Sequence, residues 1–519
     1  MQSLRAAVFA ALFLLVQTIA LVAQDITLTS RDGSVEITGT FLGFDGDFYR
    51  LDTVYGELTV DSSGVLCEGP ACPNLIDYVA ELRFSGAGTM GEVLLPALVE
   101  GFALRSGHSA RRINGEAGYF TYELTNRNED RLAGRFHFRL TTTDEGFADL
   151  MANEADIVMS LREVRAEEAR LARAAGMGDL GASGRGRVVA LDALVPLVSP
   201  DNPVSQIATP DLARVFAGKI ANWSVLGGPD APISLHLRDR KTGLGQAVMD
   251  RLLKPISADL GAEAVEHENG PELARIVAAD PFAIGFGSAS ETGNAKRLAL
   301  SGSCGFALPA VRRTIKTEDY PLTAPMFLYL PARRLPQLGR EFMTYLRSAP
   351  AQLVMRRAGF TDQAPEEIAI NLQGDRFANA ITSAGEETGL RQLQAMVTRL
   401  RGFDRLSTTF RFEAGSTRLD AQSRSNVEQL ARALEAGTYD ARELLFVGFS
   451  DGDGSATANR EISRRRALAV QEAVKMAAET ANFDRMTLGV AAFGEALPMA
   501  CDDSAWGRQV NRRVEVWVN

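Results

Sequence analysis

The spacing of apolar residues changes twice along this 519-residue chain, and each pattern requires a different kind of fold. Residues 26–66 alternate short apolar and polar runs with turns, as in VEITGTFLGF, which is typical of strands and hairpins. Residues 82–361 alternate strand-like and helix-like runs, the pattern of an α/β fold. Residues 406–519 predict the order βαβαββ, a compact α+β domain. A chain of this length also suggests roughly three domains, at about 150 residues each.

These patterns predict a multidomain α/β and α+β protein. We expect a small all-β module of about five short strands over residues 24–78, with a barrel-like shape. An α/β region follows over residues 80–361. Its run VVALDALVPLVSP is so continuously apolar that it predicts a buried parallel strand. Residues 362–405 should form a helical connector, with helical spacing over residues 386–400. The α+β domain occupies residues 406–519.

The first 23 residues resemble a secretory signal that is cleaved. Arg5 precedes an apolar run over residues 6–22, and Ala23 is a small residue suited to cleavage. The alternative is an uncleaved membrane anchor, but Gln17 and Thr18 interrupt a run that is already short for a span. The net charge of −10 gives no general attraction to nucleic acid.

Export would permit disulfide bonds, and the chain has four cysteines. The segment CEGPAC favours a small-loop disulfide between Cys67 and Cys72, with two free thiols as the alternative. A bridge between Cys304 and Cys501 has no support from the local sequence. Four scattered histidines and the lack of a C-x-x-C pair make a zinc site improbable, and we expect no metal or cofactor. The histidines also have no nearby nucleophile motif, so no catalytic residues are assigned and we do not expect an enzyme.

The segment GFSDGDGSATANREISRRRA, residues 448–467, joins an acidic loop to three consecutive arginines. A calcium-binding EF-hand loop starting at Asp451 would need Gly and Glu where Ala456 and Ile462 stand. A basic patch is excluded because consecutive helical residues point about 100° apart. Asp451 and Arg466 could instead hold the two charged ends of a zwitterionic ligand. The alternative is an internal salt bridge between them.

This segment resembles the OmpA-like peptidoglycan-binding domain, whose pattern is G-[HY]-[TS]-D, N-x-x-L-S-x-x-R-A, G-E and N-R-R-V-E. The matches run in order over residues 406–519 and end with NRRVE at residues 511–515. The resemblance implies that Asp451 and Arg466 hold the amino and carboxylate groups of diaminopimelate, with Asn459 and Ser450 in support. We expect the two charges to stand apart across an open notch, and peptidoglycan to be the partner.

The α/β region resembles the PstS-type phosphate-binding proteins of ABC importers. The segments LRFSGAGTM, ADIVMSLREV, IANWSVLGG and DPFAIGFGSA carry the resemblance over residues 80–361. It implies a periplasmic-binding-protein fold, in which two lobes on a hinge close over an anion. The matching positions are Thr89, Met90, Ser160, Arg238, Thr242, Gly243 and Leu244.

Two positions depart from that family. Leu161 stands where phosphate binders place an Asp, and Leu244 where they place a Thr. Two functions therefore remain. The first is a periplasmic, wall-anchored protein that clamps phosphate or a related oxyanion. The alternative is a wall-linked structural adaptor that no longer binds phosphate. In either case we expect location in a Gram-negative cell envelope, with an ABC permease or an envelope protein as a further candidate partner.

Overall fold

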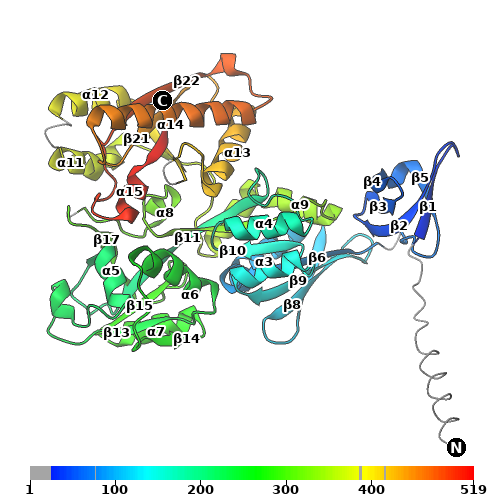
Figure 1. Ribbon diagram of the computed structural model, residues 1–519, viewed down its shortest axis with the longest axis horizontal. Helices are drawn as coiled ribbons and strands as arrows, with labels where there is room; N and C mark the ends of the chain where they lie inside the picture. Colours follow the sequence, from blue (N-terminus) through cyan, green and yellow to red (C-terminus); the bar gives the residue numbers. More distant parts are fainter. Residues whose placement is uncertain (1–24, 76–77, 305, 385–388, 414–415) are drawn as a thin grey trace, which may run out of the picture.

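The computed structural model describes residues 25–519 except 76–77, 305, 385–388 and 414–415. The segment expected to be a signal lies outside the described residues. In Figure 1 the chain runs from a small β module, through two α/β lobes, to a C-terminal domain that lies over them. No helix among the described residues combines the length and apolar character needed to span a bilayer.

The β module is one antiparallel sheet in the order β4-β3-β2-β1-β5. Its strands are β1 (Asp25–Ser30), β2 (Glu36–Phe44), β3 (Phe48–Thr53), β4 (Gly56–Asp61) and β5 (Val65–Glu68). The five expected strands are present, but the described pairings leave β4 and β5 as open edges, so the barrel-like shape is not formed. Cys67 on β5 forms a disulfide with Cys72, which follows that strand. The module contacts the first lobe through Arg334 and Arg340, which pair with Asp45 and Asp47.

The two lobes share one long mixed sheet, in the order β14-β13-β15-β11-β18-β10-β6-β9-β8-β7. The first lobe contains β6 (Ala80–Ala87), β7 (His108–Asn114), β8 (Tyr119–Asn126), β9 (Arg131–Thr141), β10 (Ile157–Ser160), α2 (Leu95–Arg105), α3 (Thr143–Met151), α4 (Ala166–Ala174), α9 (Gln337–Tyr345) and α10 (Ala349–Arg357). The second contains β13 (Ser234–Arg238), β14 (Val265–His267), β15 (Ala283–Ser288), α5 (Thr209–Phe216), α6 (Gly243–Val248) and α7 (Gly270–Ala279).

Two strands, β11 (Gly186–Val198) and β18 (Thr323–Tyr329), cross between the lobes. Val189 and Ala190 of β11 belong to the core of the first lobe, whereas residues 191 and 193–195 belong to that of the second. The expectation of a parallel strand was wrong, because β11 pairs antiparallel with both β15 and β18. Its continuous apolar run reflects burial on both faces, and such burial does not fix strand direction.

The C-terminal domain has the predicted βαβαββ order with one added helix. It contains β20 (Asp404–Arg411), α13 (Ala421–Glu435), β21 (Glu443–Phe449), α14 (Ala456–Ala477), β22 (Thr487–Gly494), α15 (Ala505–Asn511) and β23 (Arg513–Val518). The sheet order is β19-β20-β23-β21-β22, where β19 (Glu367–Ile368) comes from the connector. The connector also forms α11 (Gly374–Thr382) and α12 (Leu390–Leu400), and α12 buries Leu393, Met396 and Leu400.

Candidate functional site

The predicted wall-binding residues lie where β21 passes into α14. Gly448 permits this geometry, because a Cβ there would lie 2.0 Å from the carbonyl oxygen of Ser463 on α14. Strand and helix therefore pack closely, and the loop that follows Phe449 presents Ser450 and Asp451. Ser455 then caps α14 by accepting the N–H of Ala458. The structure brings Asp451, Arg466, Asn459 and Ser450 to this one junction.

Asp451 and Arg466 are not bonded to each other among the described ion pairs. Asp451 Oδ2 accepts from Arg512 Nη1 at 2.6 Å, while the guanidinium of Arg466 lies over the ring of Phe412, 5.2 Å from its centroid. Burial and the neighbouring guanidinium of Arg512 lower the pKa of Arg466. In the part of the chain that is described, Arg466 Nε and Ser450 Oγ have no hydrogen-bond partner although both atoms are buried.

The sequence led us to expect an open notch between the two charges, but in the structure both side chains are largely buried. Asp451 is only 9% exposed and Arg466 only 5%. Arg512 was missed as the partner of Asp451, although it lies within the NRRVE motif that signalled the domain. Asn459 is also 4% exposed and donates through Nδ2 to Glu495 Oε2 at 2.8 Å, which ties α14 to the loop after β22.

The predicted anion-binding residues lie on facing segments of the two lobes. Thr89 and Met90 follow β6 and Ser160 ends β10 in the first lobe, while Arg238 ends β13 and Thr242 to Leu244 begin α6 in the second. A Cβ on Gly243 would lie 3.1 Å from Leu161 Cδ1 and 3.2 Å from Ala87 Cβ. The lobes therefore touch at this point.

Several polar groups in this cleft already have internal partners. Ser160 Oγ donates to the Arg162 carbonyl at 2.6 Å, and Thr242 Oγ1 donates to the Asp239 carbonyl at 2.6 Å. Arg238 is 7% exposed and its Nη1 lies 3.8 Å from Glu291 Oε2, beyond hydrogen-bond length. Its Nε has no partner in the described structure. Burial raises the pKa of Glu291, which Arg238 opposes.

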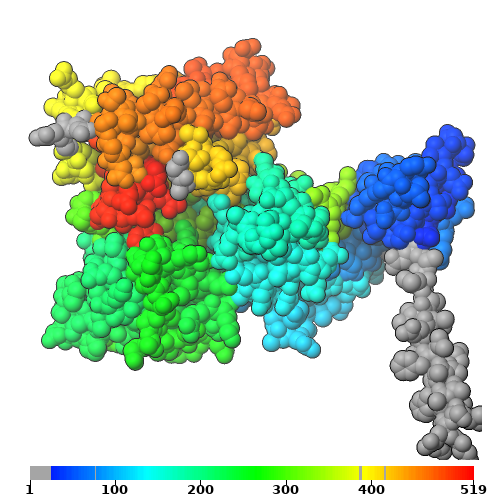
Figure 2. All heavy atoms as spheres, in the orientation of Figure 1, coloured from blue at the N-terminus to red at the C-terminus, as the bar shows by residue number. Residues whose placement is uncertain are grey.

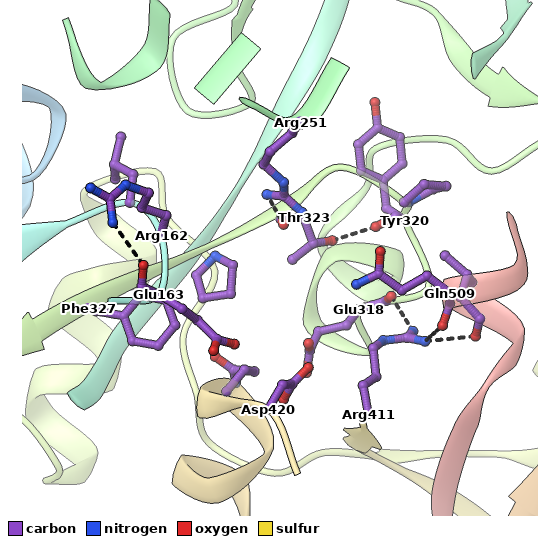
Figure 3. Close-up of a pocket in the computed structure, with 15 residues that line it drawn as sticks. Arg162, Glu163, Arg251, Glu318, Tyr320, Thr323, Phe327, Arg411, Asp420 and Gln509 are labelled. Atoms are coloured by element: carbon purple, nitrogen blue, oxygen red, sulfur yellow. Dashed lines mark hydrogen bonds between the residues drawn. The ribbon is translucent and has the colours of Figure 1, made fainter. Parts of the chain in front are cut away.

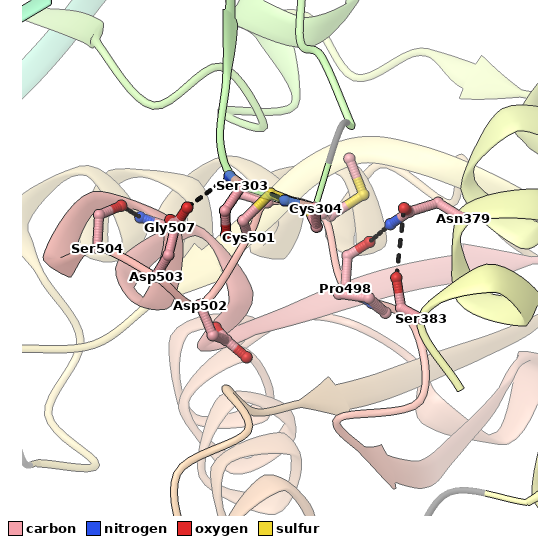
Figure 4. Close-up of a disulfide and its surroundings, with 12 residues drawn as sticks. Ser303, Cys304, Asn379, Ser383, Pro498, Cys501, Asp502, Asp503, Ser504 and Gly507 are labelled. Carbon is pink, nitrogen blue, oxygen red and sulfur yellow. Dashed lines mark hydrogen bonds between the residues drawn. A yellow bond between two sulfur atoms is a disulfide. The ribbon is translucent and has the colours of Figure 1, made fainter. Parts of the chain in front are cut away.

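The C-terminal domain docks on both lobes, which the sequence analysis did not foresee. The space-filling view shows its yellow-to-red residues against both the green and the cyan lobes (Figure 2). On the second lobe, Cys501 forms a disulfide with Cys304 (Figure 4), and the Trp506 indole donates to the Arg251 carbonyl at 2.8 Å. On the first lobe, the Ala421 N–H donates to Glu163 Oε1 at 3.0 Å. In the sequence, only the two isolated cysteines could have indicated that these domains are in contact.

A buried ionic network also joins this domain to the second lobe. Asp319, which precedes β18, accepts from Arg405 on β20 at 2.6 and 3.0 Å, and both side chains are at most 4% exposed. Burial raises the pKa of Asp319, but Arg405 outweighs this and holds it below its usual value. Arg405 also lies 3.4 Å from Glu515 on β23. Docking therefore buries an ion pair whose charges have very little contact with water.

A cavity of about 240 Å³ lies where both lobes and the C-terminal domain meet. Figure 3 shows the carboxylates of Glu163, Glu318 and Asp420 around it. Burial, with Asp420 nearby, raises the pKa of Glu163 to about 6. Burial raises the pKa of Glu318 to about 8 even though Arg411 opposes the shift. Glu318 is therefore protonated in the docked protein near neutral pH.

This protonation predicts that the folded protein becomes less stable as pH rises. The folded state holds a proton on Glu318 between the ordinary Glu pKa of 4.5 and about 8, whereas the unfolded chain does not. The unfolding free energy should therefore fall across that window, by roughly 4–5 kcal/mol from this group, and then level off. Thermal melts at a series of pH values measure this slope. Glu318→Gln, which stays neutral, should make the slope shallower, and an unchanged slope in that variant would contradict the assignment.

The chain matches two known families over separate segments. Residues 135–350 match the PBP superfamily domain, and residues 411–512 match the OmpA family. The chain thus carries a PstS-like PBP domain followed by a C-terminal OmpA domain. The first segment contains the second lobe, both crossing strands and only the part of the first lobe that lies between residues 135 and 350, and the second segment contains most of the C-terminal domain.

Among curated proteins, the chain is similar to the phosphate-binding protein PstS of Bacillus subtilis, at 29% identity over 164 residues, which are 32% of this chain and 52% of that protein. It is also similar to Protein SphX of Synechococcus elongatus, at 27% identity over 234 residues, covering 42% of this chain and 66% of that protein. The chain thus spans about half to two thirds of the length of the curated relatives it matches.

The chain is also similar to solved structures, among them the following two. An ABC-type phosphate transport receptor from Vibrio cholerae has 18% identity and a TM-score of 0.41, covering 54% of this chain and 98% of that one. The peptidoglycan-associated lipoprotein from Burkholderia pseudomallei has 22% identity and a TM-score of 0.19, covering 21% of this chain and 89% of that one.

Proposed function

We propose that this protein binds peptidoglycan through its OmpA domain and holds at the cell wall a two-lobed domain that binds a small oxyanion. The proposal rests on two buried polar atoms beside Asp451, Arg466 Nε and Ser450 Oγ, which have no hydrogen-bond partner among the described residues. A buried polar atom left unpaired costs about 1–3 kcal/mol, so a ligand that pairs with both would be favoured. Co-sedimentation of the chain with purified peptidoglycan tests the proposal.

Diaminopimelate in the stem peptide fits the charges of this junction. Its ammonium group would approach Asp451, which can accept from it and from Arg512 at the same time because a carboxylate has several lone pairs. Its carboxylate would take the free side of the Arg466 guanidinium. Binding to diaminopimelate would make the protein periplasmic and wall-associated. This agrees with the secretory signal expected from the sequence.

The oxyanion site proposed for the cleft centres on Arg238. Its unpartnered Nε and its long separation from Glu291 leave N–H groups available to an anion. Arginine binds phosphate through such forked contacts. An anion must enter when the lobes separate, because Leu161 and Gly243 now touch across the cleft. Delivery of the anion to an ABC permease is the partner role that this proposal implies.

Calorimetric titration of the chain with phosphate and with sulfate tests the cleft. We expect binding in the parent and about a tenfold loss in Arg238→Gln, since a charge-assisted hydrogen bond is removed. Glu291→Gln should bind more tightly, because the carboxylate nearest Arg238 loses its charge. Binding that is identical in the parent and in Arg238→Gln would contradict this site.

One observation favours a second candidate function, that of a wall-linked adaptor. The C-terminal domain contacts both lobes and is linked by a disulfide to the second, so it restrains the hinge movement that ligand entry requires. Leu161 and Leu244 also fill two positions of the cleft with apolar side chains. If titration with phosphate, sulfate and small carboxylates gives no heat, the adaptor role replaces oxyanion binding.

A further inference from the structure

A group of arginines outside both sites faces a cavity between the PBP domain and the OmpA domain. Arg187 comes from β11, Arg347 follows α9, and Arg432 lies on α13. The cavity has a volume of about 530 Å³. Its walls therefore come from both domains, and it lies on their shared interface.

The charges in this cavity are unbalanced. Of the described residues that line it, Glu428 alone is acidic. Arg347 Nη2 lies 3.4 Å from Glu428 Oε2, and Arg432 Nη1 lies 3.9 Å from the same atom. One carboxylate thus faces three guanidinium groups, which leaves a local charge of about +2.

The arginines also affect each other. Burial, followed by the charge of Arg347, lowers the pKa of Arg187 to about 10. Burial and Arg347 likewise lower the pKa of Arg432. Like charges held this close destabilise one another unless an anion lies between them.

Hydrogen-bond donors remain available in the cavity. Arg187 Nε makes a long contact of 3.4 Å to the Gly184 carbonyl, and the contact between Arg432 and Glu428 exceeds hydrogen-bond length. The nine-residue helix α10 also begins at the cavity wall, with Ser348 as its N-cap. The positive end of a helix adds to the attraction for anions.

We propose that this cavity binds a phosphate- or sulfate-type oxyanion between the PBP and OmpA domains. Guanidinium forks match the oxygens of such groups, and three of them converge on one space. The volume far exceeds the roughly 30 Å³ share of one water molecule, so a substituent on the oxyanion can also be accommodated. Because Arg432 belongs to one domain and Arg187 and Arg347 to the other, the bound anion stabilises their docking.

Titration of the full chain with inorganic phosphate and with glycerol 3-phosphate at low ionic strength tests the proposal. We expect Arg347→Gln/Arg432→Gln to weaken binding to this site at least tenfold. Glu428→Gln should tighten it several-fold, since the competing carboxylate becomes neutral. Tighter binding of the ester than of free phosphate assigns the site to a substituted phosphate, and the reverse assigns it to the free anion.

Two controls separate this site from the cleft. Arg238→Gln should leave this binding unchanged, and Arg464→Gln, which alters an exposed arginine on α14, should do the same. Phosphate should raise the melting temperature less in Arg347→Gln/Arg432→Gln than in the parent, and should not raise it in the triple variant that also carries Arg238→Gln. Binding that is lost in Arg238→Gln and retained in Arg347→Gln/Arg432→Gln overturns the proposal, as does equal binding in the parent and in Arg347→Gln/Arg432→Gln.

Discussion

Asp451→Ala should release the protein from purified peptidoglycan, with affinity falling about 30- to 1000-fold. The change removes the carboxylate proposed to hold the ligand ammonium and leaves that charge unpaired in a site where Asp451 is only 9% exposed. Such a loss costs about 2–4 kcal/mol, and each 1.4 kcal/mol corresponds to a factor of ten. Co-sedimentation over a range of peptidoglycan concentrations measures the change.

Matched variants separate ligand binding from folding. Asp451→Asn keeps the shape and an acceptor for Arg512, so it should fold normally and still lose most of the binding. Arg466→Ala should lose binding to a similar extent. Arg465→Ala is the control, because this neighbouring arginine is 60% exposed and points away toward Glu461. Full retention of Asp451→Ala on peptidoglycan, or equal losses in Arg465→Ala and Arg466→Ala, would show that the wall is not held here.

Asp319→Ala should destabilise the docked protein by about 3–5 kcal/mol. The substitution leaves the fully buried guanidinium of Arg405 without its bidentate partner, and an uncompensated buried charge is costly. Glu515 remains near Arg405 but is already contacted by Arg376 and Arg513, so it offsets little of the loss. Urea or thermal unfolding followed by circular dichroism measures the effect.

An exposed pair provides the control for this prediction. Asp440 pairs with Arg485 at 3.3 Å on the surface of the same domain, where the side chains are 36% and 66% exposed. Asp440→Ala should change stability by less than about 1 kcal/mol, as surface ion pairs usually do. Similar stability losses in Asp319→Ala and Asp440→Ala would mean that the buried network does not hold the domains together.

Much of the architecture could be predicted from local sequence. Alternating runs gave the five strands of the β module, and the strand–turn–helix segments gave the lobes, because side-chain periodicity follows from the geometry of each element. Residues 448–467 identified the junction of β21 and α14, since Gly448, Asp451 and Arg466 are close in sequence. The short helix α15 was missed because its seven residues carry little periodic signal.

Strand direction, the partners of charged residues and the docking of domains could not be predicted in this way. The apolar run of β11 indicates burial but not whether its neighbours run parallel or antiparallel. Arg512 as the partner of Asp451 depends on contacts 61 residues apart, and the disulfide from Cys304 to Cys501 depends on contacts 197 residues apart.

The sequence alone determined most of the longer helices and strands and which side chains lie at the turns between them, since those properties depend on neighbours a few residues away. The tertiary structure alone decided that the C-terminal domain contacts both lobes, that Asp319 meets Arg405, and that three arginines from two domains face one cavity. The physical reason is that burial and charge pairing depend on surfaces that come together only after the elements have folded.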